Sequence, residues 1–300
     1  MPHNPFPPRI RTVAVVAPAG PAASEAVASG CRQLQAWGLD VKVMPHVFTG
    51  ADESYLAAPA AARRCDLEQC WREPDIDLVL CARGGFGTAH LLPHLDWTLL
   101  RSRPLPLIGY SDITALQLAM YRHRCGPLLA APMCGRLGDL AADDYTCYYY
   151  ARALADQVTA EPVCLPGGGD RMTVLQEGTA AGPLLAVNLA VAATLCGTPF
   201  MPDLSGHILL VEDVGEAVYR LDRFLTQLAQ CGVLGGLAGL VFGSFRDCGT
   251  APERERLFRR IGAAVSGPVL TGFPFGHTFP LAAVRQGRRA VIEADGRIRL

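Results

Sequence analysis

The first half of the chain alternates short apolar runs with segments of helical spacing, and this alternation limits the possible folds more than any other feature. The runs are apolar on both faces, which predicts a parallel sheet with helices on each side. We therefore expect an α/β fold with a doubly wound parallel sheet, in which Asp52 caps the second helix. The expected strands are 11–17, 39–45, 75–82, 105–109 and 127–133, and the expected helices are 22–37, 52–71, 87–100, 112–124 and 141–154.

The pattern changes near residue 158. Residues 159–180 contain three consecutive glycines, and we expect a linker there. The rest of the chain mixes strands with helices, so we predict an N-terminal domain at 1–158 and a C-terminal domain at 181–300. In the second domain the expected strands are 207–212, 237–244, 268–273 and 288–294, and the expected helices are about 188–196, 215–230 and 252–264.

Composition excludes several classes of protein. Half of the 300 residues are hydrophobic and 18% are charged, as in a globular protein. The formal net charge of −1 gives no field that could hold a polyanion, so we expect no nucleic-acid partner. The apolar runs near 184–197 and 231–245 are not suited to cross a bilayer. The proline-rich start predicts a short disordered lead without an export signal.

The cysteines and histidines give no support for a metal site. Eleven cysteines are scattered along the chain without a C-x-x-C pair, which argues against a disulfide framework or a structural zinc site. We expect most of them to be small buried side chains in a cytoplasmic protein. His90 and His94 are four residues apart, but the glutamate of H-E-x-x-H is missing and Pro93 interrupts the helix. No metal or other cofactor is expected.

One serine stands at the end of a predicted strand. Ser111 follows the run 105–109 and precedes the helix 112–124, so its hydroxyl can lie beside free helix N–H groups, which can stabilise an oxyanion. This is the logic of a nucleophile elbow, although Gly-Tyr-Ser-Asp is not the G-x-S-x-G pattern. The alternative is that Ser111 or Asp112 only caps the helix.

A nucleophilic serine needs a base and an orienting carboxylate. His277 lies on a loop between Pro274 and Pro280, where it can be held rigidly, although it can also be an ordinary loop residue. Glu212 is the last residue of the expected strand 207–212, a position that helix capping does not explain. The glycine-rich residues 83–87 can supply an oxyanion-binding N–H. Phosphate binding is the weaker alternative, because the turn after the first strand lacks G-x-G-x-x-G.

Several segments together resemble one known family. ARGGFG, LIGYSDITAL, ILLVEDVGEAVYRLDR and GFPFGHT are similar, in order and spacing, to segments of the LD-carboxypeptidases. These are serine peptidases of the S66 type, and the microcin C self-immunity peptidase belongs to the same family. The resemblance covers the chain from about residue 11. It implies a flavodoxin-like N-terminal domain, a smaller swivelling β/α C-terminal domain and a homodimer.

The resemblance also implies roles for single residues. It implies a triad of Ser111 as nucleophile, Glu212 as orienting group and His277 as base. It further implies an oxyanion hole formed by the backbone N–H groups of Gly85 and Asp112, and the Asp112 side chain is then left to cap the helix. The usual substrate of the family is the murein tetrapeptide, which loses its terminal D-alanine in the cytoplasm during cell-wall recycling.

The substrate contacts remain open. An exopeptidase must bind a terminal carboxylate, for which Arg83 is a candidate, and Asn188 is a second candidate contact. The chain departs from the family pattern at Ala186-Val187 and at Ala282. Two other functions therefore stay possible: hydrolysis of a peptidyl-nucleotide or another amide by the same residues, or non-catalytic binding on an α/β scaffold.

Overall fold

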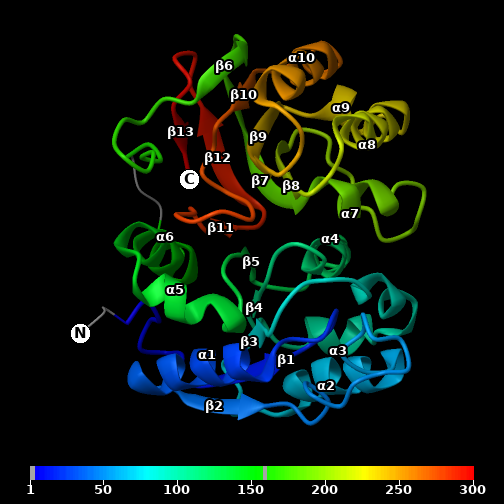
Figure 1. Cartoon of the computed structure of the whole chain (residues 1–300), viewed down its shortest axis with the longest axis vertical. Coiled ribbons are helices and arrows are strands. Elements are labelled where there is room, and N and C mark those ends of the chain that lie inside the picture. Colours follow the sequence, from blue (N-terminus) through cyan, green and yellow to red (C-terminus); the bar gives the residue numbers. More distant parts are fainter. Residues whose placement is uncertain (1–3, 158–160) are drawn as a thin grey trace. The chain divides into compact units, whose positions relative to one another are not determined.

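The computed structural model describes residues 4–157 and 161–300, and the chain forms two compact units, Met1–Asp156 and Gln157–Leu300 (Figure 1). Residues 159 and 160 of the expected linker lie outside the described residues, and so do residues 1–3 of the expected lead.

The N-terminal unit alternates strands and helices along the chain. Its elements are β1 (Thr12–Val16), α1 (Ser24–Ala36), β2 (Asp40–Val43), α2 (Ala60–Arg72), β3 (Leu78–Cys81), the 3-10 helices η1 (Thr88–His90) and η2 (Leu92–His94), α3 (Trp97–Arg101), β4 (Leu107–Ile108), α4 (Ile113–Arg122), β5 (Leu128–Ala130), η3 (Cys134–Arg136), α5 (Leu137–Ala141) and α6 (Asp144–Ala155). The strands pair in parallel in the order β5-β4-β3-β1-β2, which is the flavodoxin-like order. The predicted α/β class and parallel sheet are confirmed.

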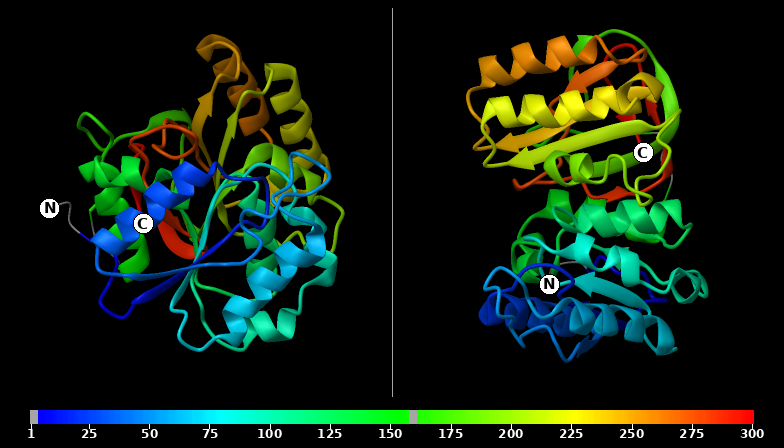
Figure 2. Two further views of the ribbon diagram at one scale, coloured as in Figure 1. Left: turned by 60° about the horizontal axis from the view of Figure 1, so that its bottom comes forward. Right: turned by 90° about the vertical axis from the view of Figure 1, so that its right-hand side faces the viewer.

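Helices pack on both faces of this sheet (Figure 2, left). α1 packs with α5, and α2 packs with α3. Strand β3 is buried along its whole length, and Leu34 of α1 and Leu67 of α2 are fully buried. Each such side chain stabilises the fold by roughly 1.5–3 kcal/mol relative to an exposed one. The apolar runs recognised in the sequence therefore form the core.

Two expected helices are shorter than predicted. The helix expected from Asp52 begins only at Ala60, after Pro59, so Asp52 does not cap it. Proline has no N–H and disfavours helical conformation in the residue before it, which explains the late start. The helix expected at 87–100 is instead η1, η2 and α3, and Asp96 caps α3 by accepting a hydrogen bond from the Leu99 N–H (2.9 Å). His90 and His94 therefore do not share one helix face.

Two expectations about burial are wrong. The described part of the lead is packed, because Phe6 is 5% exposed and its ring lies 5.8 Å from Trp37 and 5.7 Å from Tyr150, measured between centroids. Most cysteines are not buried. Only five are, and the other six are partly or fully exposed: Cys31, Cys65, Cys147, Cys164, Cys196 and Cys231.

The C-terminal unit has a seven-stranded mixed sheet in the order β13-β12-β7-β8-β9-β10-β6. Its elements are β6 (Thr173–Gln176), β7 (Ala180–Asn188), α7 (Leu189–Thr194), β8 (Ile208–Val214), α8 (Val218–Gln230), α9 (Val233–Gly236), β9 (Gly239–Arg246), α10 (Ala251–Gly262), β10 (Val269–Thr271), β11 (Val284–Arg285), β12 (Arg288–Ile292) and β13 (Ile298–Arg299). The strands from β7 to β10 are parallel, and β6 and β12 add to them in the antiparallel direction.

This unit differs from the prediction at its start. β6 lies inside the segment expected to be a linker, where it pairs with β10. Residues 180–188 form the longest described strand, β7. It was not predicted as a separate strand, because its apolar run continues into α7. α8 and α10 lie side by side on the sheet (Figure 2, right). The parallel core places Asn188 and Glu212 opposite each other at the carboxyl ends of β7 and β8.

Candidate active site

Ser111 occupies the turn between β4 and α4 in an unusual backbone conformation. Its φ is 64°, in the left-handed region that a residue with a side chain adopts only at a cost. The Thr114 N–H donates to the Ser111 carbonyl (2.9 Å), so helical hydrogen bonding starts directly after the turn. A strained serine between a strand end and a helix start is the geometry of a nucleophile elbow. It is not the geometry of a simple N-cap residue, whose backbone is extended.

The glycine-rich loop 83–87 lies directly against this serine. A Cβ atom at Gly84 would lie 2.9 Å from Ser111 Cβ and 3.1 Å from its Oγ, so only glycine fits there. Among the described residues, the backbone N–H groups of Gly85 and Asp112 donate to no backbone carbonyl. Two such N–H groups on the loop and the turn around one serine are the donor type that an oxyanion hole requires.

The Asp112 side chain does not cap α4, contrary to expectation. Its Oδ2 accepts a hydrogen bond from the Thr88 N–H (2.9 Å) and lies 2.9 Å from Thr88 Oγ1, which is also 2.6 Å from the Asp112 carbonyl oxygen. Burial raises the pKa of this carboxyl, and the bonds from Thr88 oppose the rise. Asp112 thus ties the glycine-rich loop to the Ser111 turn.

Gln117, a second buried polar residue near the Ser111 turn, was not predicted from the sequence. Gln117 is 2% exposed, and its Nε2 donates to the carbonyl oxygens of Gly109 (2.9 Å) and Leu129 (2.8 Å). These atoms follow β4 and belong to β5, so the amide holds the strand ends beneath Ser111. The sequence feature that could have indicated this role is the single amide side chain in the apolar helix segment ITALQLAM.

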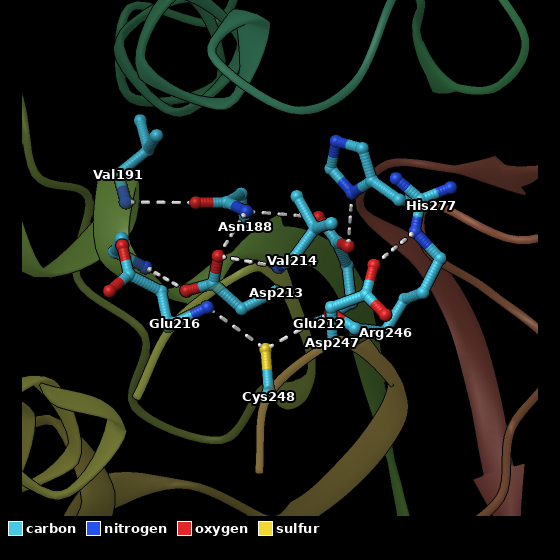
Figure 3. A network of polar contacts seen from close by, with 11 residues as sticks. Asn188, Val191, Glu212, Asp213, Val214, Glu216, Arg246, Asp247, Cys248 and His277 are labelled. Atoms are coloured by element: carbon cyan, nitrogen blue, oxygen red, sulfur yellow. Dashed lines mark hydrogen bonds and ion pairs between the residues drawn. The ribbon is translucent and has the colours of Figure 1, made fainter. Parts of the chain in front are cut away.

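In the C-terminal unit, Glu212 and His277 form a hydrogen-bonded pair (Figure 3). His277 Nδ1 lies 2.7 Å from Glu212 Oε2, and the histidine side chain is 17% exposed while the glutamate is fully buried. Such a contact fixes the ring orientation and favours the tautomer with hydrogen on Nδ1, which leaves Nε2 as a base. The pairing of β8 with β9 shifts register between Val211 and Asp213, so Glu212 stands at a break in the ladder.

Asn188 hydrogen-bonds to Glu212 and links it to Asp213 (Figure 3). Asn188 Nδ2 donates to Glu212 Oε1 (3.2 Å) and to Asp213 Oδ1 (3.0 Å), while its own Oδ1 accepts from the Val191 N–H (3.1 Å) and caps α7. Asp213 also accepts from the Ala190 N–H (3.0 Å). Burial raises the pKa of Asp213 to about 6. From the sequence, Asn188 was expected only as a substrate contact, and the role of Asp213 was not predicted.

Close packing shapes the loop that carries His277. A Cβ at Gly276, whose φ is 140°, would lie 2.9 Å from Ser244 Cβ and 3.0 Å from Glu212 Oε2. The Ala282 N–H donates to the Pro274 carbonyl (2.6 Å) and closes the loop. Ala282 and Ala186 are buried. At these departures from the family pattern, the side chains therefore belong to the packed interior.

The remaining predicted residue, Arg83, is exposed at the end of β3, where its Nη1 donates to the Pro21 carbonyl (2.8 Å). Gly85, Ser111 and Asp112 thus come together in the N-terminal unit, and Asn188, Glu212 and His277 come together in the C-terminal unit. Across residues 4–157 and 161–300, no group of three or more His, Cys, Asp or Glu side chains is arranged to hold a metal ion. No helix in those ranges has both the length and the apolar character of a membrane span.

Comparison with known proteins identifies both units. Residues 13–128 match the LD-carboxypeptidase N-terminal domain and residues 181–292 match the LD-carboxypeptidase C-terminal domain. The murein tetrapeptide carboxypeptidase of Pseudomonas aeruginosa is 36% identical, over 94% of this chain and 93% of its own. The crystal structure of the muramoyltetrapeptide carboxypeptidase from Oxalobacter formigenes has a TM-score of 0.83 at 28% identity, covering 96% and 97% of the two chains. The microcin C7 self-immunity protein of Escherichia coli is 24% identical, over 94% and 89%.

Proposed function

Because this chain belongs to the LD-carboxypeptidase family, we propose that it is a serine carboxypeptidase that releases the terminal D-alanine from the murein tetrapeptide. The observation that carries the proposal is the hydrogen bond from the partly exposed His277 to the fully buried Glu212. A buried carboxylate behind an imidazole is the arrangement that prepares a general base. The strained backbone of Ser111 supports its assignment as the nucleophile.

The proposed mechanism uses these three side chains in sequence. Ser111 Oγ attacks the carbonyl carbon of the bond before the terminal residue, and His277 Nε2 takes the serine proton. The N–H groups of Gly85 and Asp112 bind the oxyanion. His277 then gives the proton to the leaving amine of D-alanine, and water releases the acyl group from Ser111. Glu212 stabilises the imidazolium throughout.

The substrate contacts are part of the same proposal. Arg83 lies two residues beyond β3, in the loop that carries Gly85, and its cationic group suits the terminal carboxylate of the substrate. Asn188 is assigned to position Glu212, because both ends of its amide already bind protein atoms. The cytoplasmic location and the homodimer that the family resemblance implies also belong to this proposal.

The direct test is incubation of the purified protein with murein tetrapeptide and measurement of D-alanine by mass spectrometry. We expect release by the wild type and by Ser102→Ala, which changes an exposed serine outside the site, and none by Ser111→Ala. A wild type that releases no D-alanine from this or related peptides contradicts the proposal.

The similarity to the microcin C7 self-immunity protein supports a second candidate function, which is hydrolysis of a peptidyl-nucleotide by the same residues. Aspartyl sulfamoyl adenosine, a ligand in a solved structure of that protein, is a suitable probe. The ratio of kcat/KM for the two substrates decides between them. A fluorophosphonate probe separates both from a non-catalytic binding protein, which would show no labelling that depends on Ser111.

A further inference from the structure

Arg63 is a charged side chain in the interior of the N-terminal unit. It lies on α2 and is 2% exposed, whereas its neighbour Arg64 reaches the surface. Burying a guanidinium is costly unless hydrogen bonds compensate for the lost water. The bonds that Arg63 makes therefore indicate why a cation, rather than an apolar side chain, occupies this position.

The Arg63 guanidinium joins three separate loops. Nε donates to the Ala58 carbonyl (2.7 Å), and Nη1 donates to the carbonyls of Pro18 (2.5 Å) and Gly87 (2.8 Å). Nη2 is buried and has no hydrogen-bond partner among the described residues. A Cβ at Gly87 would lie 3.0 Å from Nη1 and 2.6 Å from Leu56 Cδ2, so only glycine lets this carbonyl approach the cation.

Two of these loops meet at the proposed oxyanion-binding residue. The Gly20 N–H donates to the Gly84 carbonyl (3.1 Å), and a Cβ at Gly85 would lie 3.1 Å from Gly20 Cα. The loop 18–20 therefore packs directly on the backbone of Gly84 and Gly85, and Arg63 holds both this loop, at Pro18, and the far end of the glycine-rich loop.

This same end of the glycine-rich loop is tied to the Ser111 turn. Thr88, which follows Gly87, bonds to Asp112 through both its N–H and its hydroxyl. The Asp112 carboxylate also interacts electrostatically with the Arg63 charge. A chain of contacts thus runs from Arg63 through Gly87 and Thr88 to the turn of the proposed nucleophile.

We propose that Arg63 is a positioning residue that sets the direction of the Gly85 N–H by fixing the Pro18 and Gly87 carbonyls around it. A lysine keeps the charge, but a single ammonium group cannot reproduce the planar array of donors that reaches three carbonyls. This inference rests on the proposed function, because the Gly85 N–H matters only if it stabilises an oxyanion.

The test compares Arg63→Lys and Arg63→Met with Arg64→Met, which removes a guanidinium from the same helix but loses only a surface bond to the His94 carbonyl. We expect both Arg63 variants to lower kcat for murein tetrapeptide by about tenfold or more, because loss of a whole oxyanion donor costs on the order of 10²–10³. KM should change little, and Arg64→Met should match the wild type.

Hydrogen exchange provides a readout that is independent of activity. Amides of residues 84–88 should exchange faster in Arg63→Lys, whereas those of β3 and β4 should keep their wild-type rates. An unchanged kcat in Arg63→Lys overturns the inference, and so does a rise in exchange that is equal over the whole unit.

If Arg63→Met does not fold, the result for Arg63→Lys decides whether the inference holds. If the wild type itself releases no D-alanine, the proposed function fails, and the exchange data alone then support or overturn the role of Arg63 in placing the loop.

Discussion

Ser111 and Asp213 each hold an unfavourable state that the surrounding structure enforces. Ser111 has a left-handed backbone, and Asp213 is a carboxyl group that is 3% exposed beside another buried carboxylate, Glu212. Neither feature stabilises the fold at neutral pH. Strain and buried charge of this kind are concentrated at functional sites, where selection acts on reactivity rather than on stability.

The conformation of Ser111 predicts a stability difference between two inactive variants. Ser111→Gly relieves the left-handed strain, whereas Ser111→Ala keeps it, so we expect the glycine variant to be more stable by roughly 1 kcal/mol. Urea unfolding of the two variants measures this difference. Equal stability, or a more stable alanine variant, would show that the backbone of residue 111 is not strained in solution.

The raised pKa of Asp213 predicts a pH dependence of stability. Its pKa rises from an ordinary value of 3.8 to about 6 on folding, so the protonated form is favoured in the native state. Protonation of Asp213 therefore adds at most about 3 kcal/mol to the free energy of unfolding. This contribution is fully present below about pH 4 and is lost as the pH rises through 6.

Asp213→Asn removes this titration. As the pH rises from 4 to 6.5, we expect the free energy of unfolding of the wild type to fall relative to that of Asp213→Asn. The exposed Asp203 provides a control, because hydrogen bonds from Ser205 lower its pKa from 3.8, so Asp203→Asn should show no such change in this window. A constant difference across the window contradicts a raised pKa.

At the scale of elements, the site in the N-terminal unit depends on two backbone segments that touch. The loop 83–88 and the turn from β4 to α4 pack with no room for a side chain at Gly84. Asp112 and Gln117 then fix the turn to its surroundings. The elements are short, and β4 has only two residues, so the position of Ser111 comes from these contacts rather than from the strand itself.

This packing predicts the effect of a single methyl group. Gly84→Ala places a Cβ 2.9 Å from Ser111 Cβ, and we expect kcat to fall at least about tenfold and the unfolding free energy to fall by about 1–3 kcal/mol. Gly235→Ala, at a glycine with no atom within 4 Å of the added Cβ, should change neither. Wild-type activity in Gly84→Ala would mean that the loop and the turn move apart freely.

At the scale of the whole molecule, the proposed nucleophile and its proposed base belong to different units. Ser111 lies in Met1–Asp156, and Glu212 and His277 lie in Gln157–Leu300. Strands β1 to β5 belong to one sheet, and β6 to β10, β12 and β13 belong to another. The proposed chemistry therefore requires both units, although each group of residues is ordered within its own unit.

This division predicts that labelling of one unit depends on the other. His277→Ala should reduce the rate of fluorophosphonate labelling at Ser111 on the order of a hundredfold or more, because the base that activates the serine is lost. His207→Ala, a change outside the site in the same unit, should label at the wild-type rate. Labelling that is unaffected by His277→Ala would separate the histidine from the nucleophile.

The sequence by itself determined the α/β class, the parallel sheet and the family, because these follow from local periodicity and from residue order along the chain. It also pointed to Ser111, Glu212 and His277 as candidates, since each stands near a strand end. Two expectations about helix starts, made from local sequence alone, were wrong. α2 begins only after Pro59, and the Asp112 side chain binds Thr88 instead of capping α4.

Only the tertiary structure decided how the site is supported. The Glu212–His277 contact joins residues 65 positions apart, Asn188 and Asp213 are 25 positions apart, and Arg63 reaches a carbonyl 45 positions away. Such contacts depend on which chain segments come together after folding, and on whether a buried polar group finds a partner there. Neither condition leaves a periodic pattern in the sequence, so the buried network of Arg63, Asp112, Gln117 and Asp213 became visible only in the folded units.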